Sequence, residues 1–504
     1  MAEPVRARVT LAELLAVLSL AADLGMGQPM EHVLRQCLIA LRLAERLGVN
    51  EAEREVVYYS ALVAWVGCHV DAYEQAKWFG DDTALKSDFR HTDFATPTSR
   101  PLFMLRHLGT GLPAGERARL GLTQPVRDSV EQTFERWDGK GVPKGARGEE
   151  ILLAARLVAL ADVVEVFHRA GGTDAAIDVA RQRRGTQFDP AIADLFAAEA
   201  AVLCAGLDDA ATWDAVMTAE PARGVRLGEE QVEAMLEAIA DFADVKSPYT
   251  IGHSRGVADL AGEAARVFGL GEASARQVRL AGLVHDLGRL GVPNTVWDKR
   301  AQLSHAETER VRLHPYFTER MLICSPALAP LAAIAVQHHE RMDGSGYPRG
   351  LSGGAISPAG RLLAATDYYH SRTEPRPHRQ ACGLSEAAAQ LRAQAKAGRL
   401  DAEAAAAVLT AAGHRATRRQ ARPDGLTSRE VEVLRLLARG LSNREIAERL
   451  VISRRTASHH VEHIYAKTGT TNRALASLYA ASHGLIGEPE PLASGIPSRE
   501  PASS

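Results

Sequence analysis

The sequence predicts an all-α protein, and three observations support this fold class. Apolar residues recur at three- and four-residue spacing through residues 10–78, as in amphipathic helices. Thr427 is followed three residues later by Glu430, a capping-box pattern that predicts the start of a helix. The pairs His285-Asp286 and His338-His339 lie in apolar surroundings of helical character. A predominantly helical architecture is therefore expected along the chain.

Length and composition limit the possible functions. A chain of 504 residues suggests two to four domains, and a formal net charge of −3 means that any nucleic-acid site must be local. The five cysteines form no CxxC pair, which predicts reduced thiols in the cytoplasm. The first apolar run is broken by Glu13 and Asp23, so we expect an amphipathic helix there, with no signal peptide and no membrane span.

The N-terminal elements follow from the same periodicity. We expect helices over residues 10–25, 30–48 and 51–67, with Gly48 ending the second. A looser segment from about residue 80 to 124 contains the turn signals TPTSRP and GLPAGE. A further helix is expected over residues 151–168.

The histidine-rich stretches indicate a metal site. Burying adjacent polar side chains is unfavourable unless a metal or a partner satisfies them. Imidazole nitrogens and carboxylate oxygens are ligands that suit iron, manganese or zinc. One such pair alone would be better explained by core histidines, but His285-Asp286 and His338-His339 occur in one region.

Residues 249–379 contain, in order, YTIGHS, HDLGRLGVP, RLHP, HHERMDGSGYPRGLSG, GRLLAATDYY and RPHR. This series resembles HD-GYP phosphodiesterases, and the resemblance extends over residues 227–413. It implies an HD-type helical bundle that hydrolyses cyclic di-GMP at a centre of two or three metals, with Asp286 bridging two of them. The implied ligands are His253, His285, Asp286, His314, His338, His339 and Asp367.

Two departures from the family pattern affect the implied chemistry. Three-metal members carry a glutamate where this chain has Tyr249, so we expect two divalent ions, iron or manganese. Arg289 replaces the lysine that follows the His-Asp pair, and arginine is effectively never deprotonated. Arg289 is thus expected to hold a phosphate, with a structural role as the alternative. The resemblance also implies substrate contacts for Tyr347, Arg376 and Arg379.

An internal repeat relates the two halves before the C-terminal region. Shifting the chain by 221 residues places His253 on His32, and a shift of 205 residues places MDGSGYP on WDGKGVP. The second shift also matches Asp367 with Asp162, whereas the other ligands are replaced. Residues 1–206 therefore resemble a degenerate HD-GYP copy, with 207–226 as a connector. Chance similarity between two Ala/Leu-rich segments is the alternative.

The C-terminal region changes in character. Residues 414–425 are basic and turn-rich, which predicts a linker, and residues 486–504 predict a disordered tail. Residues 426–485 resemble a LuxR-type helix-turn-helix domain of four helices, in which Ser453 caps the recognition helix. The resemblance implies that DNA bases are read by Ser458, His459 and Glu462, and that the DNA backbone is contacted by Arg454, Arg455, Thr456 and Lys467. A protein-interaction module is the alternative.

The sequence thus predicts two HD-type bundles in tandem followed by a LuxR-type domain. The expected function is a cytoplasmic transcription regulator that binds DNA as a homodimer and hydrolyses cyclic di-GMP, with His285, Asp286 and Arg289 as catalytic residues. One alternative is a sensor that binds the nucleotide and hydrolyses it only weakly. Another is a phosphohydrolase that acts on a different nucleotide.

Overall fold

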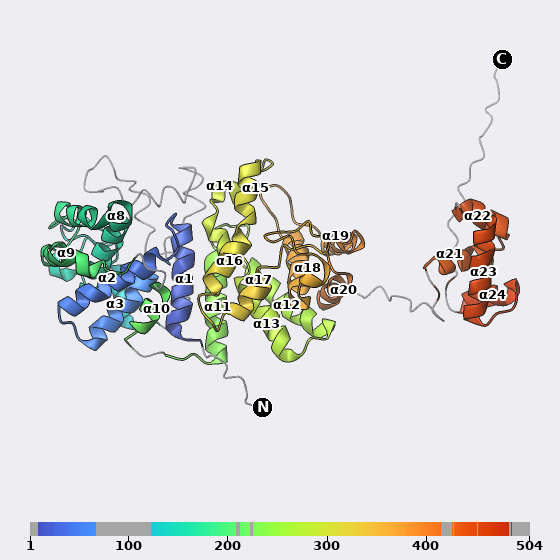
Figure 1. Cartoon of the computed structure of the whole chain (residues 1–504), viewed down its shortest axis with the longest axis horizontal. Coiled ribbons are helices and arrows are strands. Elements are labelled where there is room, and N and C mark those ends of the chain that lie inside the picture. The colour runs from blue at the N-terminus through green and yellow to red at the C-terminus, as the bar shows by residue number, and fades with distance from the viewer. Residues whose placement is uncertain are drawn as a thin grey trace, which may run out of the picture. The chain divides into compact units, whose positions relative to one another are not determined.

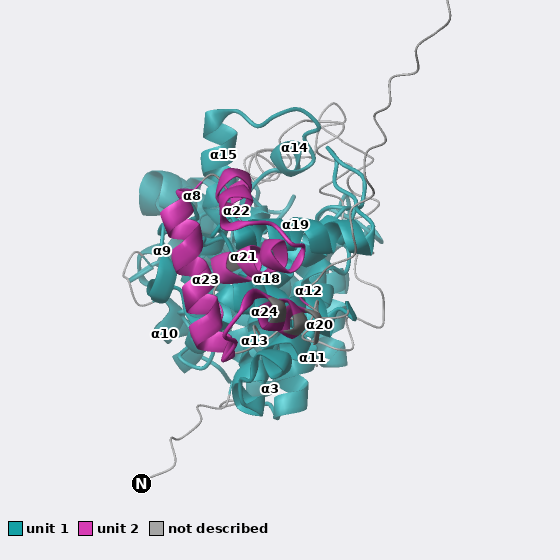
Figure 2. Cartoon of the chain, turned by 90° about the vertical axis from the view of Figure 1, so that its right-hand side faces the viewer, with its two compact units in different colours: residues 1–414 teal, residues 415–504 magenta. Residues whose placement is uncertain are grey.

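The computed structural model describes residues 9–66, 122–207, 212–221, 225–414, 426, 428–450, 452–482 and 485. These residues form helices and turns with no β-strands, which confirms the all-α prediction (Figure 1). The chain divides into two compact units, residues 1–414 and 415–504 (Figure 2). Most of the expected loose segment, the linker from residue 415 to 425 and the C-terminal tail lie outside the described residues.

The first half of unit 1 begins with helices close to the predicted positions. Thr10 caps the first helix by accepting from the Glu13 backbone, and Asn50 caps the third by accepting from the Glu53 backbone. The described α-helices of this half are α1 (Leu11–Gly25), α2 (His32–Arg46), α3 (Glu51–Val63), α7 (Gln124–Glu131), α8 (Leu153–Gln182), α9 (Pro190–Leu203) and α10 (Thr212–Thr218). A short 3-10 helix, η4 (Gly148–Glu150), precedes α8.

The second half of unit 1 carries the predicted ligands. Its α-helices are α11 (Glu229–Asp244), α12 (His253–Phe268), α13 (Glu272–Val284), α14 (Asn294–Trp297), α15 (His305–Arg312), α16 (His314–Leu322), α17 (Ala329–Ala335), α18 (Pro358–Thr373), α19 (Leu384–Lys396) and α20 (Ala402–Ala411). Two 3-10 helices complete it, η5 (Leu287–Gly291) and η6 (Gly353–Ala355).

The two halves share local features at positions that the sequence repeat relates. A left-handed residue precedes α2 and α12, namely Glu31 with φ 81° and Gly252 with φ 80°. A Cβ on Gly141 would lie 2.4 Å from the backbone nitrogen of Arg136, and a Cβ on Gly346 would lie 2.4 Å from that of Arg341. Only glycine therefore fits at these two turns.

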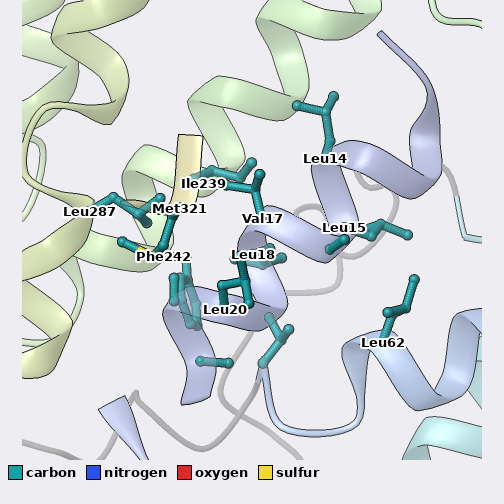
Figure 3. Packing of buried hydrophobic residues seen from close by; sticks show 14 of the residues in the cluster. Leu14, Leu15, Val17, Leu18, Leu20, Leu62, Ile239, Phe242, Leu287 and Met321 are labelled. Carbon is teal, nitrogen blue, oxygen red and sulfur yellow. The ribbon is translucent and has the colours of Figure 1, made fainter. Parts of the chain in front are cut away.

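Helix α1 packs against both halves of unit 1. Figure 3 shows Leu15 directed toward Leu62 of α3, while Val17 lies beside Ile239 of α11. The buried α1 residues belong to one hydrophobic cluster that also contains Leu287 of η5 and Met321 of α16. Because η5 directly follows His285-Asp286, the first half contributes to the packing behind the predicted metal site.

Unit 2 has a separate hydrophobic core. Its helices are α21 (Ser428–Ala438), α22 (Asn443–Leu450), α23 (Arg454–Thr468) and α24 (Arg473–Ser482). The side chains of Leu434, Leu437, Ile446 and Ile464 are fully buried within it. Ser453 accepts a hydrogen bond from the Thr456 backbone, as predicted for the cap of α23. The predicted cap Thr427 lies outside the described residues.

Candidate metal centre

The seven predicted ligands converge in the second half of unit 1. His253 and His314 are the first residues of α12 and α16, and Asp367 lies within α18. His285 and Asp286 follow α13, while His338 and His339 lie shortly after α17. Gly288 permits this convergence, because a Cβ there would lie 2.0 Å from the His314 carbonyl oxygen.

Six of the ligands form two groups. The nitrogen and oxygen atoms of His253, His285 and Asp367 lie within 4.8 Å of one another. The same limit holds for His314, His338 and His339. Each group offers three donors, so each could hold one cation.

Asp286 lies between the two groups. Its Oδ2 is 3.6 Å from His285 Nε2 and 3.8 Å from His253 Nε2. Its Oδ1 is 3.3 Å from His314 Nε2 and 3.5 Å from His338 Nε2. This carboxylate therefore directs one oxygen to each group of candidate donors.

Hydrogen bonds to the outer ring nitrogens orient three of the histidines. Nδ1 of His285 lies 2.7 Å from the Gly282 carbonyl oxygen. Nδ1 of His314 and of His338 each lie 2.6 Å from the carbonyl oxygen three residues earlier. Such bonds leave Nε2 as the coordinating atom. His285 Nε2 is buried and makes no hydrogen bond to any described residue, as a nitrogen reserved for a metal would be. The donor set therefore fits a divalent metal centre.

The electrostatics of the centre favour a neutral imidazole at His285 and His314 but a protonated one at His253. Burial would lower the pKa of His253, but Asp367 and Glu374 outweigh it and raise this pKa to about 10, so a cation would have to displace a proton there. Burial lowers the pKa of His285 to about 4 and also lowers the pKa of His314. Burial alone would raise the pKa of Asp286, but His285 and Arg289 outweigh it and hold this pKa well below its usual range. Neutral imidazoles around an ionised carboxylate are the ligand forms that bind metals.

Arg289 and Tyr347, both predicted to contact substrate, lie beside the ligands. The Arg289 guanidinium is 3.1 Å from Asp286 Oδ2, and it stacks over the ring of Trp297 at 3.9 Å. The ring centroid of Tyr347 is 4.7 Å from that of His339. These side chains place a cation and an aromatic surface at the edge of the metal ligands.

The two RPHR arginines use their donors within the protein. Arg376 donates to the Tyr249 carbonyl oxygen and to the Glu374 carboxylate, both at 2.9 Å. Arg379 donates to the carbonyl oxygens of Arg372 and Glu374. Arg376 therefore adjoins the metal ligands, whereas Arg379 braces the loop that follows α18.

The structure adds two residues that the sequence reasoning did not assign. Glu374 Oε2 lies 2.8 Å from His253 Nδ1, and His370 Nδ1 lies 3.3 Å from Glu374 Oε1. His370 is half-buried. The available signal was spacing, because His370 follows Asp367 by three residues on one face of α18 and Glu374 directly follows that helix.

The equivalent region of the first half holds different chemistry. His32 Nε2 lies 2.9 Å from Asp162 Oδ1, and its Nδ1 contacts the Glu165 carboxylate. Trp65 and Phe134, which the repeat aligns with Asp286 and His339, pack edge to face at 5.3 Å. The described part of this half contains no cluster of three candidate metal donors like those of the second half.

The predicted DNA-contacting residues of α23 are exposed except for Ser458, which is half-buried. The exposed ones are Arg454, Arg455, Thr456, His459, Glu462 and Lys467. Ser458 instead accepts from Asn443 at 3.1 Å, and Lys467 pairs with the buried Glu430 at 2.8 Å. Ser458 and Lys467 therefore join helices within unit 2. In neither unit is any described helix long and apolar enough to cross a membrane.

Comparison with known families gives one match over the candidate metal centre and another over the candidate DNA-binding helix. The HD domain family matches residues 112–192 and 237–404, and the luxR family of bacterial regulatory proteins matches residues 424–480. The 3′3′-cGAMP-specific phosphodiesterase 3 of Vibrio cholerae is 30% identical over 414 residues, which cover 75% of this chain and 90% of that protein. A cyclic di-GMP phosphodiesterase of Pseudomonas aeruginosa is 38% identical over 140 residues, which cover 28% of this chain and 34% of that protein.

A solved structure extends the likeness to the fold. A crystal structure of a cyclic GMP-AMP specific phosphodiesterase from V. cholerae matches with a TM-score of 0.60 and 27% identity, covering 81% of this chain and 98% of that one. The match therefore includes much of the first half as well as the metal ligands. The chain belongs to the HD-GYP phosphodiesterase family and carries a LuxR-type domain at its C-terminal end.

Proposed function

We propose that the second half of unit 1 hydrolyses a phosphodiester bond of a cyclic dinucleotide at a two-metal centre. The observation that carries this proposal is the position of Asp286, whose two oxygens face separate groups of ligands. Two bound cations would neutralise phosphate charge and lower the pKa of the attacking water. The proposed holders of these cations are the seven residues that converge at the site.

The chain's own side chains supply the remaining functions. The guanidinium of Arg289 is held over Trp297, where it is placed to pair with a phosphate oxygen in a forked geometry. Tyr347, beside His339, offers an aromatic surface for a base or ribose. Arg376 adds positive charge next to His253, which favours a dianionic substrate.

We propose 3′3′-cGAMP as the first substrate to test and cyclic di-GMP as the second. The cyclic di-GMP phosphodiesterase of P. aeruginosa aligns with only 28% of this chain. The cGAMP-specific relative aligns with 75% of it, including part of the first half. Similarity over both halves supports the mixed dinucleotide as the first substrate.

We also propose that residues 1–206 are a second HD-type copy that binds no metal. The HD domain match over residues 112–192 and the shared turns at Gly141 and Gly346 support common ancestry. The Trp65–Phe134 pair occupies positions equivalent to metal ligands, and carboxylates hold His32 on both sides. This half is thus proposed to have a structural role, with α1 packed against η5.

Unit 2 is proposed to bind DNA, so that the protein acts as a transcription regulator. The exposed residues Arg454, Arg455 and His459 lie along α23, which corresponds to the recognition helix of the LuxR-type motif. A regulator that binds nucleotide with little turnover is a second candidate. The ion pair between Arg289 and Asp286 favours it, because this pair competes with a cation for the Asp286 carboxylate.

The test is turnover of 3′3′-cGAMP and cyclic di-GMP by the full chain with Fe²⁺ or Mn²⁺. His285→Ala should abolish hydrolysis, whereas the matched change His32→Ala in the first half should leave the metal centre loaded. Tight nucleotide binding without hydrolysis by the metal-loaded protein would support the sensor instead. Neither binding nor turnover of either dinucleotide would overturn the proposed substrate class.

A further inference from the structure

We propose that Glu374 is a positioning residue for the metal centre, because its carboxylate holds the ring of His253 in the orientation that directs Nε2 to a cation. This inference rests on the proposed metal centre. It starts from a difference between His253 and the other ligands. His285, His314 and His338 each place Nδ1 on the carbonyl oxygen three residues earlier. His253 does not.

The ring of His253 has a different acceptor. The carbonyl oxygen three residues before it, on Thr250, accepts only the backbone N–H of His253, at 2.9 Å. Glu374 Oε2 lies 2.8 Å from Nδ1 of the ring. His253 Nε2 then faces Asp367 Oδ1 at 3.4 Å and Asp286 Oδ2 at 3.8 Å.

Glu374 is itself held by Arg376, which donates to its Oε2 at 2.9 Å. His370 Nδ1 lies within ion-pair distance of Oε1, at 3.3 Å, without a hydrogen bond to it. The His370 ring is in turn placed against α12, since a Cβ on Gly256 would lie 2.1 Å from His370 Nε2. The Glu374 carboxylate thus has a defined direction, set by Arg376 and by the packing of His370 against α12. A residue that orients a metal ligand needs such a fixed direction.

A carboxylate does more than a carbonyl oxygen at this place. It fixes the Nδ1–H tautomer, and its negative charge makes Nε2 a more basic ligand. Arg376, which the family resemblance assigns to substrate binding, shares the same carboxylate. Glu374 therefore ties a metal ligand of the first group to the arginine beside the proposed phosphate site.

A third cation among His253, His370 and Glu374 is the competing explanation, because their donor atoms also lie within 4.8 Å of one another. Such a cation would need His253 Nδ1, while Nε2 of the same ring already faces the first group. Our proposal gives Nδ1 a hydrogen bond and leaves the stoichiometry at two cations. Metal content thus separates the two explanations.

The experiment measures metal affinity in the full chain by competition with a chelator. Glu374→Gln keeps the size of the side chain but removes its charge, so we expect about 10- to 100-fold weaker retention of one cation. Glu374→Asp, which keeps the charge, should recover part of this loss. Glu403→Gln is the matched control, because Glu403 is exposed on α20 and remote from these residues in sequence.

Further readings separate positioning from folding. The metal-free Glu374→Gln protein should still unfold in one cooperative transition, at a melting temperature lowered by loss of the ionic contact with Arg376, and Arg376→Gln should retain both cations. Unchanged metal affinity in Glu374→Gln would overturn the inference, as would a content of three cations in the wild type that falls to two in this variant. If the wild type binds two cations but hydrolyses neither dinucleotide, the proposed activity is wrong and the role of Glu374 stands. If the wild type binds no cation, both the proposed activity and the proposed role of Glu374 are wrong.

Discussion

The carboxylate of Asp286 is buried yet ionised, because imidazoles and a guanidinium surround it. Burial would raise its pKa, but the nearby His285 and Arg289 hold that pKa well below the usual range. Removing a charge-compensating partner from such a cluster leaves the others unsatisfied. Single substitutions at this centre should therefore differ in how many cations the protein loses.

Asp286→Asn should remove both cations, since one oxygen of Asp286 faces each group of ligands. His314→Ala should mainly remove the cation of the second group, so that metal content falls from about two ions per chain to about one. Elemental analysis of the two variants beside His305→Ala, an exposed histidine at the start of α15, checks this. Equal metal loss in the Asp286 and His314 variants would contradict the two-group geometry.

Arg289→Ala should weaken nucleotide binding about 10- to 100-fold, because charge-assisted hydrogen bonds contribute about 1.5–3 kcal/mol. Arg289→Lys should keep much of this affinity, since it retains the positive charge. Titration calorimetry with the metal-loaded protein gives both dissociation constants. Arg392→Ala serves as the control, because Arg392 is exposed on α19. An unchanged dissociation constant in Arg289→Ala would assign this residue a structural role.

Sequence motifs predicted which side chains meet at the centre, but not how their second contacts are made. The seven ligands could be named because the motif order carries them. Glu374 was missed because its contact with His253 joins residues 121 positions apart. Lys467 is exposed as a DNA contact would require, and the structure adds a pairing with Glu430 of α21 that the motif did not predict. Periodicity gives the face of a helix, but the competing neighbour on that face comes from tertiary packing.

At the scale of elements, α2 and α8 meet through the buried cluster of His32, Asp162 and Glu165. Burial would raise the pKa of Glu165, but the pairing with His32 outweighs it and lowers that pKa below the ordinary value of 4.5. The ionised carboxylate thus stabilises the fold above about pH 4.5, and this contribution is lost as the pH falls through the lowered folded-state pKa.

Glu165→Gln should therefore lower the free energy of unfolding at pH 7 by about 1–3 kcal/mol. The difference between variant and wild type should shrink as the pH falls below 4.5, because protonation removes the same charge in the wild type. Calorimetric melting of the full chain across this pH range measures it, with the exposed Glu149→Gln as control. A difference that persists unchanged into acid would argue against a role for the charge.

The predicted DNA contacts of α23 are of two kinds, to the phosphate backbone and to the bases, and each kind predicts a different effect of substitution. Arg455→Ala should weaken binding to all DNA sequences and reduce the salt dependence by about one unit of slope, because Arg455 is expected to contact the phosphate backbone. Substituting His459 should instead change which sequence is preferred, at a cost of about 1–3 kcal/mol. Binding isotherms at several salt concentrations separate these effects. Lys467→Ala is expected to change stability as well, since it breaks the pair with Glu430.

At the scale of the whole molecule, the packing of α1 affects how the domains can be studied. The helix order was predictable from periodicity and caps, but the placement of α1 against both halves was not, because it depends on which apolar faces meet (Figure 3). Truncation before residue 220 would expose the apolar residues of α11, η5 and α16 that cover α1. Point substitutions in the full chain are therefore the sounder way to compare the halves.

The LuxR-type domain leads to the last prediction, that the full chain binds DNA as a dimer on two half-sites. In domains of this kind a dimer places one recognition helix in each of two major grooves, so half-sites are separated by about one helical turn. Footprinting on sites selected from random DNA should show two protected half-sites, and sedimentation of the complex should give two chains per DNA. Leu475 on α24 is the substitution to make, because this large apolar side chain is 44% exposed and is therefore a candidate dimer contact. Leu475→Glu should weaken dimer binding while leaving the weaker binding of one chain to a single half-site.

A footprint over one half-site by a monomeric wild-type protein would contradict the dimer, and failure to select any DNA would leave unit 2 as a protein-interaction module.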